Sequence, residues 1–174
     1  SKPDTLDVAL PSTTARLVLE MLKQQSGTLV RGIPYKGSST SMTDLIGGQV
    51  PLAIDTVSAS RAFIASGKVK ALAVTSLNAS ALLPGTKPAA AQGVDGFQVL
   101  AWNGLYDPRG TPPAVVQRLN AELAKILSQP EIRQRLLDLG HESAGGSAGE
   151  LADFAKAERQ KWGPLITKVG LKAE

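Results

Sequence analysis

The first 75 residues alternate between short apolar runs and segments with helical spacing of apolar positions. The apolar runs predict strands at 6–10, 28–33, 51–54 and 70–75, the last apolar almost throughout, as in a parallel sheet covered on both faces. Helices are expected between them, the first ending near Gly27, the second ending at Gly47-Gly48 and the third over 58–66. This strand–helix–strand alternation with short connections predicts right-handed βαβ units and an α/β fold.

The pattern changes after residue 75. The segment 76–96 has turn chemistry, with one helical turn expected at 89–92, and 97–106 is interpreted as a strand interrupted at Asn103-Gly104. Three helices are then predicted: from Thr111, as N-cap, to Gln129, from Pro130 to Leu139, and from Ser147 to Val169.

Two sequences resemble capping boxes, in which a Ser or Thr side chain and an acidic side chain three residues later cap a helix start together. Ser147 is followed at this spacing by Glu150, and we expect the last helix to begin there. Ser41 is followed by Asp44, a shorter partner, which predicts the start of the second helix.

Composition narrows the class of protein. With 174 residues, 43% hydrophobic and 20% charged, the chain is a plausible single globular domain. The net charge of +4 admits acidic partners, but Lys and Arg are dispersed and aromatic residues scarce, so no nucleic-acid surface is expected. There is no cysteine for a disulfide framework and no apolar run of membrane-spanning length. The N-terminus does not resemble a signal peptide, and we expect the chain to begin mid-protein.

The first candidate site is the segment 12–16, where a strand's carboxyl end meets a helix N-terminus. Open α/β sheets bind ligands at that edge, and free N–H groups with the helix dipole favour an anion there. Thr13 and Thr14 add hydroxyl donors, and Arg16 could give a carboxylate a bidentate contact. The alternative is an ordinary N-cap followed by a solvated arginine.

Two further segments are predicted at the same edge. Asp55 ends a strand and is either an acceptor for a ligand group or water, or the N-cap of the helix near Ser58. The turn with Tyr35, Lys36 and Ser38–Thr40 could face the same crevice, where Lys36 would add positive potential. The alternative for Lys36 is a solvated turn residue.

Signals of an enzyme, a metal site or a cofactor are poor. His141 is the only histidine, is expected at the surface, and has no cysteine or second histidine to form a metal cluster or a triad with. No lysine follows Gly145-Gly146 at the spacing of a phosphate-binding loop. Trp102 and Trp162 are interpreted as core anchors rather than ligand platforms. We therefore expect no catalytic residue, metal or cofactor.

An ordered set of motifs resembles one protein family. They are Pro-Tyr-Lys-Gly-Ser at 34–38, Asp-Leu-Ile-Gly-Gly-Gln-Val at 44–50, the run 67–76, Ala-Trp-Asn-Gly-Leu at 101–105, Pro-Arg-Gly-Thr-Pro at 108–112 and Arg-Leu-Asn-Ala-Glu at 118–122. From about Leu6 to Glu174 the chain is similar to the Bug/TctC type, the periplasmic solute-binding proteins of tripartite tricarboxylate transporters.

The resemblance implies a two-lobed fold of the type II periplasmic binding proteins. Such proteins hold a small carboxylate between the lobes and pass it to membrane transporter subunits. It implies that residues 1–96 are the second, ligand-binding lobe and that 97–174 return toward the first lobe, whose opening βα units are absent. The chain is then either a fragment or a shortened relative.

The resemblance also bears on the site. Relatives have a Gly-rich turn, then a Thr/Ser pair and usually a histidine, where this chain has Leu10-Pro11-Ser12, Thr13-Thr14 and Arg16. The arginine strengthens the case for a negatively charged ligand, and the loop that begins with Asp55 would contact ligand or water. Thr13, Thr14, Arg16 and Asp55 are expected to converge in one crevice.

Two other classes of protein are alternatives to this interpretation. An effector-sensing domain of a transcription regulator shares the type II topology, and a small α/β enzyme would be revealed by turnover of a carboxylate. Neither explains the ordered motifs. Without a first lobe, the last helices would leave six apolar side chains partly uncovered, so they would refold onto their own lobe or pair as a homodimer; these side chains are Val115, Leu119, Leu123, Phe154, Trp162 and Leu165.

Overall fold

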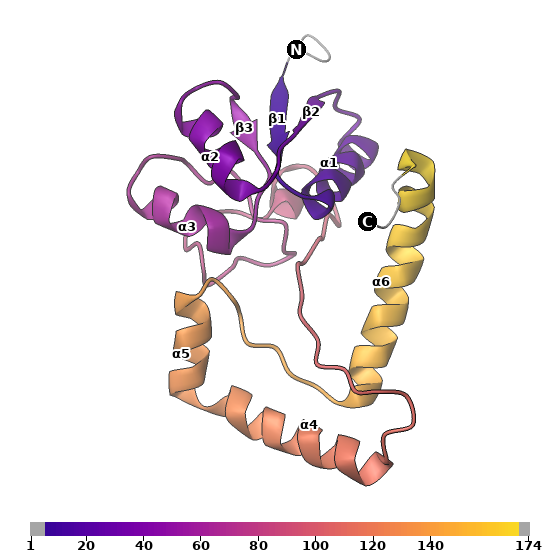
Figure 1. Ribbon diagram of the computed structural model, residues 1–174. Helices are drawn as coiled ribbons and strands as arrows, with labels where there is room; N and C mark the ends of the chain where they lie inside the picture. Colours follow the sequence, from indigo (N-terminus) through magenta and orange to yellow (C-terminus); the bar gives the residue numbers. More distant parts are fainter. Residues whose placement is uncertain (1–5, 171–174) are drawn as a thin grey trace. The chain divides into compact units, whose positions relative to one another are not determined.

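The computed structural model describes residues 6–170, and Figure 1 shows their course. The elements are β1 (Asp7–Leu10), α1 (Thr13–Ser26), β2 (Arg31–Pro34), α2 (Ser38–Ile46), β3 (Leu52–Ala53), α3 (Val57–Ala65), the 3₁₀ helix η1 (Ala89–Gln92), α4 (Pro113–Ser128), α5 (Pro130–Asp138) and α6 (Ala148–Val169). The expected helical turn at 89–92 is confirmed by η1, and the helices after Pro130 and Ser147 are confirmed by α5 and α6.

The chain divides into two compact units between Ala101 and Trp102. The strands and α1 to α3 belong to the first unit, and α4 to α6 belong to the second. The expected division into 1–96 and 97–174 lies a few residues earlier, and the role assigned to each part stays a prediction.

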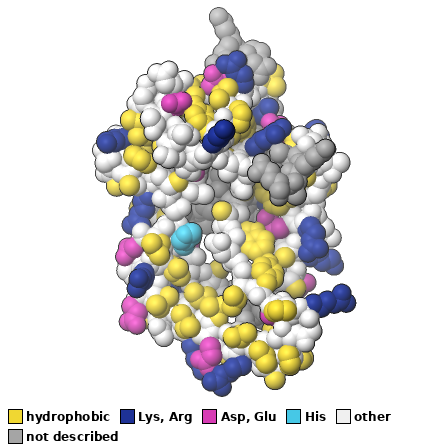
Figure 2. Space-filling view, viewed as in Figure 1, with side chains coloured by type: hydrophobic (Ala, Val, Ile, Leu, Met, Phe, Trp, Pro, Cys, Tyr) yellow, Lys and Arg dark blue, Asp and Glu magenta, His cyan; other side chains and the backbone are white. Residues whose placement is uncertain are grey.

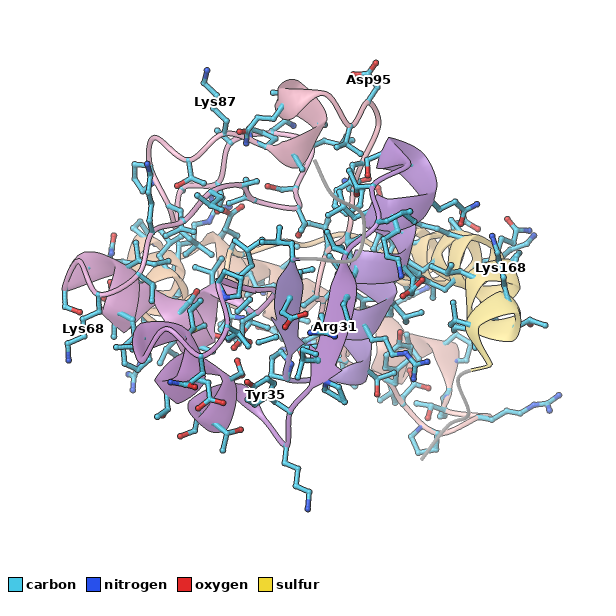
Figure 3. The ribbon with its side chains drawn as sticks, turned by 90° about the horizontal axis from the view of Figure 1, so that it is seen from above. Arg31, Tyr35, Lys68, Lys87, Asp95 and Lys168 are labelled. Carbon is cyan, nitrogen blue, oxygen red and sulfur yellow. The ribbon has the colours of Figure 1, made fainter. Side chains whose placement is uncertain are left out.

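The first unit is built on a parallel sheet in the order β2-β1-β3. Asp7 pairs with Arg31 and Leu10 with Pro34 on one side of β1, while Ala9 pairs with Ala53 on the other. Helix α1 packs on β1 and β2, and α2 packs on β1 and β3. Because the two crossovers run in opposite directions and parallel crossovers are right-handed, α1 and α2 cover opposite faces of the sheet (Figure 3). The predicted α/β class is confirmed.

One core cluster of this unit lies between β1 and α1. Val8 and Leu10 pack against Ala15 and Leu19, and all four side chains are buried. Gly32 in β2 is required by this packing, since a Cβ atom there would lie 2.5 Å from Leu10 Cδ1. The apolar run of β1 therefore supplies the contacts that hold α1 on the sheet.

Local signals account for several helix ends. The Ser12 hydroxyl accepts a bond from the Ala15 N–H (3.1 Å), and Gly27 ends α1 in the left-handed conformation. The capping box of α6 is confirmed: the Ser147 hydroxyl accepts from the Glu150 N–H (3.2 Å), and Glu150 Oε2 accepts from the Ser147 N–H (2.7 Å).

The predicted capping box at Ser41 and Asp44 is wrong. Helix α2 already begins at Ser38 after Gly37, so Ser41 lies inside the helix and is fully buried. Asp44 instead accepts a hydrogen bond from the hydroxyl of Tyr35 (2.8 Å). The Asp44 carboxylate, to which the local pattern assigned a role in capping the helix, is therefore hydrogen-bonded to a residue nine positions away.

The start of α4 also differs from the prediction. The helix begins at Pro113 with Pro112 as its N-cap. The Thr111 hydroxyl, expected to cap the helix, donates to the carbonyl of Pro108 (2.8 Å) and closes the preceding turn. The helix therefore starts two residues beyond Thr111.

The strands predicted at 70–75 and 97–106 are wrong. Within the described residues, the first of these segments forms only an isolated bridge from Val74 to Pro88, and the second forms no strand. The backbone of Val74 bonds to Lys87 and Ala89, and the N–H of Val99 donates to the carbonyl of Thr75 (2.8 Å). These bonds satisfy the polar backbone of buried residues without a continuous ladder.

The helices of the second unit expose large apolar side chains, and Figure 2 shows hydrophobic side chains gathered over α4 and α5. Three of the six side chains expected to be uncovered are exposed: Val115, Leu119 and Phe154. Leu123 and Trp162 are half-buried, and Leu165 is buried, contrary to the expectation.

The two tryptophans differ in their surroundings. Trp102 stacks edge-on against Phe154 at a centroid distance of 5.2 Å, but both remain exposed, so its predicted role as a core anchor is wrong. Trp162 is half-buried, and its ring N–H donates to Glu158 (2.8 Å). His141 is exposed, as expected.

An ion pair at the amino end of the sheet gives a pH-dependent prediction. Arg31, labelled in Figure 3, donates to both carboxylate oxygens of Asp7 (2.7 and 2.8 Å), and this hydrogen bonding holds the pKa of Asp7 below its ordinary value. Because the folded pKa is the lower one, the pair stabilises the fold above the unfolded pKa, and the contribution is lost as the pH falls through the folded pKa. We expect Arg31→Ala to raise the Asp7 pKa toward its ordinary value in an NMR titration, and Lys23→Ala to leave it unchanged. An Asp7 pKa that does not respond to Arg31→Ala would contradict this assignment.

Candidate ligand-binding site

The candidate site is the carboxyl edge of the sheet. Because the three strands are parallel, their carboxyl ends at Leu10, Pro34 and Ala53 share one edge. Each strand is followed there by the N-terminus of a helix: α1, α2 and α3. Three helix N-termini with their free N–H groups therefore point to the same side of the molecule.

The strand order reverses between β1 and β3. From β1 the chain crosses to β2 on one side and then returns past β1 to β3 on the other. In open α/β sheets, ligands bind outside the carboxyl ends of the strands at such a switch point. Since Ala9 pairs with Ala53, the register brings Pro11 and Asp55 to the same level just beyond the paired residues. The segment that begins α1 and the loop with Asp55 are thus neighbours at this edge.

Asp55 links two of the three loops. Its Oδ1 accepts hydrogen bonds from the Ser38 hydroxyl (2.9 Å) and from the Thr56 N–H (2.8 Å). The alternative in which Asp55 caps α3 is wrong, because Thr56 is the N-cap and its hydroxyl accepts from the Ala59 N–H (3.3 Å). The Ser38–Asp55 bond ties the start of α2 to the end of β3, across the end of the central strand.

A buried oxygen of the same carboxylate lacks a partner. Asp55 Oδ2 and the hydroxyl of Ser41, one turn after Ser38 on α2, are buried and have no hydrogen-bond partner among the described residues. Buried polar groups of this kind are unusual and mark places where water or a rearrangement supplies the missing bond. Asp55 is therefore anchored through one oxygen and unsatisfied at the other.

The start of α1 is electropositive and open to solvent. Thr13 and Thr14 form its exposed first turn, which has no acidic residue, and Arg16 is exposed two residues later. The side chains of Thr13, Thr14, Arg16 and Lys36 form no hydrogen bond or ion pair with any residue that the structure describes. Their donors are thus available to a ligand.

The structure joins only part of the predicted site by direct contact. Ser38 and Asp55 are hydrogen-bonded, whereas no hydrogen bond or ion pair among the described residues links them to the side chains of Thr13, Thr14, Arg16 or Lys36. Convergence of Thr13, Thr14, Arg16 and Asp55 in one crevice stays a prediction. Sequence reasoning missed Thr56 as the N-cap of α3, although a threonine directly before a helix is a usual N-cap and could have identified it.

Other kinds of site find little support in the described residues. No group of three or more His, Asp or Glu side chains there could hold a metal ion. In the same part of the chain, no helix combines the length and the hydropathy that a membrane span needs.

Comparisons with known proteins place the chain among solute receptors. Residues 7–171 match the family described as "Tripartite tricarboxylate transporter family receptor" (TctC). A UPF0065 protein in the tcbD-tcbE intergenic region of Pseudomonas sp. strain P51 is 40% identical over 92% of this chain and 48% of its own length. A UPF0065 protein in the clcB-clcD intergenic region of Pseudomonas knackmussii is 38% identical over 88% of this chain and 92% of its own length. The chain spans about half the length of most of the curated relatives it matches.

Solved structures agree with this result. The R. palustris protein Rpa4515 with adipate is 30% identical, with a TM-score of 0.81 over 97% of this chain and 57% of its own. The periplasmic binding protein BugD is 33% identical, with a TM-score of 0.74 over 99% and 59% of the two chains. MatC from Rhodopseudomonas palustris with bound malate is 29% identical, with a TM-score of 0.71 over 94% and 57%.

The family match covers nearly the whole chain, and the fold superposes on solved binding proteins with TM-scores of 0.71 to 0.81. The motifs recognised in the sequence lead to the same assignment. The chain therefore belongs to the TctC family, the receptors of the tripartite tricarboxylate transporters.

Proposed function

We propose that this protein is an extracytoplasmic solute-binding protein that captures a small carboxylate for a tripartite tricarboxylate transporter. One observation carries the proposal: in a member of the TctC family, the exposed N-terminus of α1 and the loop with Asp55, which is bonded to Ser38, follow neighbouring strands at the switch point of the sheet. The ligand would bind at this edge and pass to the membrane subunits of the transporter.

The chemistry of the edge suits an anion. The free N–H groups of the first turn of α1 and the hydroxyls of Thr13 and Thr14 are donors, and the helix dipole adds partial positive charge. Arg16 supplies a full charge and two parallel N–H groups that match a carboxylate. Ser38 and Asp55 would fix the opposite wall, and Lys36 would add positive potential.

The superposed proteins support this ligand class. One holds adipate and another holds malate, and both ligands are small dicarboxylates. A further one is a periplasmic binding protein, which supports a periplasmic location for this chain. The solute-binding role of the family favours capture of a ligand over its chemical conversion.

A thermal-shift series tests the proposal. We expect adipate or malate to raise the melting temperature, while the uncharged diamides of the same acids do not. Ligand at ten times its dissociation constant stabilises the fold by about 1.4 kcal/mol, which corresponds to a shift of roughly 3–6 °C for a chain of this size. Equal shifts with acids and diamides would contradict anion recognition, and consumption of the ligand during incubation would identify an enzyme instead.

A further inference from the structure

The hydroxyl of Ser41 is a buried polar group without a local hydrogen bond. Ser41 lies inside α2 and is fully buried, and its Oγ has no hydrogen-bond partner among the described residues. A serine within a helix commonly donates to the carbonyl four residues earlier. For Ser41 that carbonyl belongs to Gly37, which instead accepts from the hydroxyl of Thr40 (3.0 Å). The Ser41 hydroxyl therefore lacks the bond that its own helix could supply.

Asp55 lies on the same side of α2 as Ser41. Ser38 and Ser41 are three residues apart, so their side chains share one side of the helix. The Ser38 hydroxyl donates to Asp55 Oδ1 (2.9 Å), which identifies this side as the one that faces Asp55. Asp55 Oδ2 is the other buried side-chain oxygen without a partner among the described residues. An unsatisfied acceptor thus lies at the end of β3, and an unsatisfied hydroxyl lies within one turn of it on α2.

The chemistry of these two oxygens defines the group that would satisfy both. A carboxylate oxygen only accepts hydrogen bonds, whereas a serine hydroxyl donates and accepts. A ligand hydroxyl can donate to Asp55 Oδ2 and accept from the Ser41 hydroxyl. An ammonium group has no lone pair to accept from Ser41, and a second carboxylate would be repelled by Asp55. A neutral hydroxyl is therefore the group that fits these two oxygens.

The two oxygens lie next to the predicted carboxylate site. Neighbouring strands of a sheet are about 4.8 Å apart, and the register of β1 with β3 places Pro11 and Asp55 at the same level. The first turn of α1, which follows Pro11, has no acidic residue and is close to Arg16. Asp55 is half-buried and Thr56 is exposed, so the unsatisfied carboxylate oxygen lies just beneath the surface of this edge. A hydroxyl on the carbon next to a carboxyl group has the short spacing that this arrangement requires.

We propose that Ser41 and Asp55 form a hydroxyl-binding subsite and that the ligand of this protein is a 2-hydroxy carboxylate. The Ser41 hydroxyl donates to the ligand hydroxyl, and Asp55 Oδ2 accepts from it. The inference rests on the proposed function, because it adds a second recognised group to the carboxylate bound at the same edge. Leaving two buried oxygens unsatisfied costs stability in the free protein, and the ligand hydroxyl offsets that cost on binding.

Isothermal titration calorimetry with malate and succinate tests the proposal on the 174-residue chain, because these two acids differ only in the 2-hydroxyl group. The wild-type chain is expected to bind one enantiomer of malate at least about tenfold more tightly than succinate, since a site that bonds a hydroxyl discriminates against a ligand without one. Ser41→Ala is expected to reduce this preference at least about threefold and to leave succinate binding unchanged. Without ligand, the melting temperature of Ser41→Ala should equal or exceed that of wild type, because the substitution removes an unsatisfied buried hydroxyl.

Two further variants sharpen the test. Asp55→Asn keeps one oxygen for the bonds from Ser38 and Thr56 but replaces the acceptor Oδ2 with an amide donor, so the preference for malate should also fall. Ser26→Ala is the matched control: it removes a half-buried serine hydroxyl at the far end of α1, where Ser26 donates to the carbonyl of Leu22 (2.7 Å). The control is expected to keep the full preference for malate.

Four results would overturn the proposal. Equal wild-type affinities for malate and succinate would exclude the hydroxyl subsite and leave carboxylate capture intact. A Ser41→Ala chain with the full preference for malate would place the hydroxyl contact elsewhere. A Ser41→Ala chain that melts at a lower temperature and binds both acids more weakly would assign Ser41 a structural role only. If neither acid binds and adipate gives no thermal shift, the proposed function fails and this inference fails with it.

Discussion

Phe97→Ala is expected to lower the free energy of unfolding by about 3–5 kcal/mol, the usual cost of truncating a buried aromatic side chain to alanine. Phe97 is fully buried and is the largest such side chain among the described residues. The segment around it makes isolated hydrogen bonds rather than a ladder: the Phe97 N–H donates to Val94, the Val99 N–H donates to Thr75, and the Val99 carbonyl accepts from the Thr75 hydroxyl (2.7 Å). Urea denaturation followed by circular dichroism measures the loss.

The matched control lies three residues further along the same segment. Leu100 is 41% exposed, so Leu100→Ala removes little buried surface and is expected to cost less than about 1 kcal/mol. Natural domains are stable by roughly 5–15 kcal/mol, so the Phe97 variant should unfold at much lower urea while the Leu100 variant stays close to wild type. Equal losses in the two variants would contradict the burial of Phe97.

Arg16→Ala is expected to weaken the binding of adipate or malate by about 10- to 100-fold, because a charge-assisted hydrogen bond to an anion contributes roughly 1.5–3 kcal/mol. Arg16 is exposed near the start of α1 and forms no hydrogen bond or ion pair with the residues that the structure describes. Its removal should therefore leave the stability of the unliganded protein almost unchanged. Isothermal titration calorimetry measures the affinity, and thermal unfolding without ligand measures the stability.

Two variants distinguish a direct contact between Arg16 and the ligand from a general effect of the protein's net charge. Lys23→Ala removes one positive charge from the last turn of the same helix, where Lys23 pairs with Glu20 (3.2 Å), and should leave affinity unchanged. Arg16→Lys keeps the charge but loses the two-pronged donor, so an intermediate affinity is expected. If Arg16→Ala binds as tightly as wild type, the carboxylate site lies elsewhere.

Sequence patterns predicted the elements whose signals are local. The helix ended by Gly27 and the capping box of Ser147 and Glu150 depend on neighbours within four residues, and both are confirmed. The strand expected at 70–75 failed because an apolar run does not show which backbone it pairs with, and in this segment only Val74 is buried. Val74 found its partners at Lys87 and Ala89, which no periodicity reveals.

In the candidate site, too, features with local sequence signals were predictable and features set by tertiary contacts were not. The ends of β1 and β3 could be recognised from Pro11-Ser12 and from Asp55, because turn and cap residues follow strand ends. The Ser38–Asp55 bond joins residues seventeen positions apart, and Ser41 is buried by tertiary packing, so neither was predictable from local chemistry. The strand ends at which the candidate residues lie were thus accessible from sequence, whereas the contacts of these residues depend on the sheet order.

The order β2-β1-β3 also sets when the fold can form. All three paired strands lie between Asp7 and Ala53, and β1 is the first of them to leave the ribosome. It must wait unpaired until β2 and then β3 follow, at roughly 5–20 residues per second. The strand that becomes the buried centre of the sheet is therefore the one exposed longest during synthesis. Early docking of α1 through Ala15 and Leu19 would cover the apolar side chains of β1. The nascent chain could therefore shield β1 from water before any strand pairing is possible.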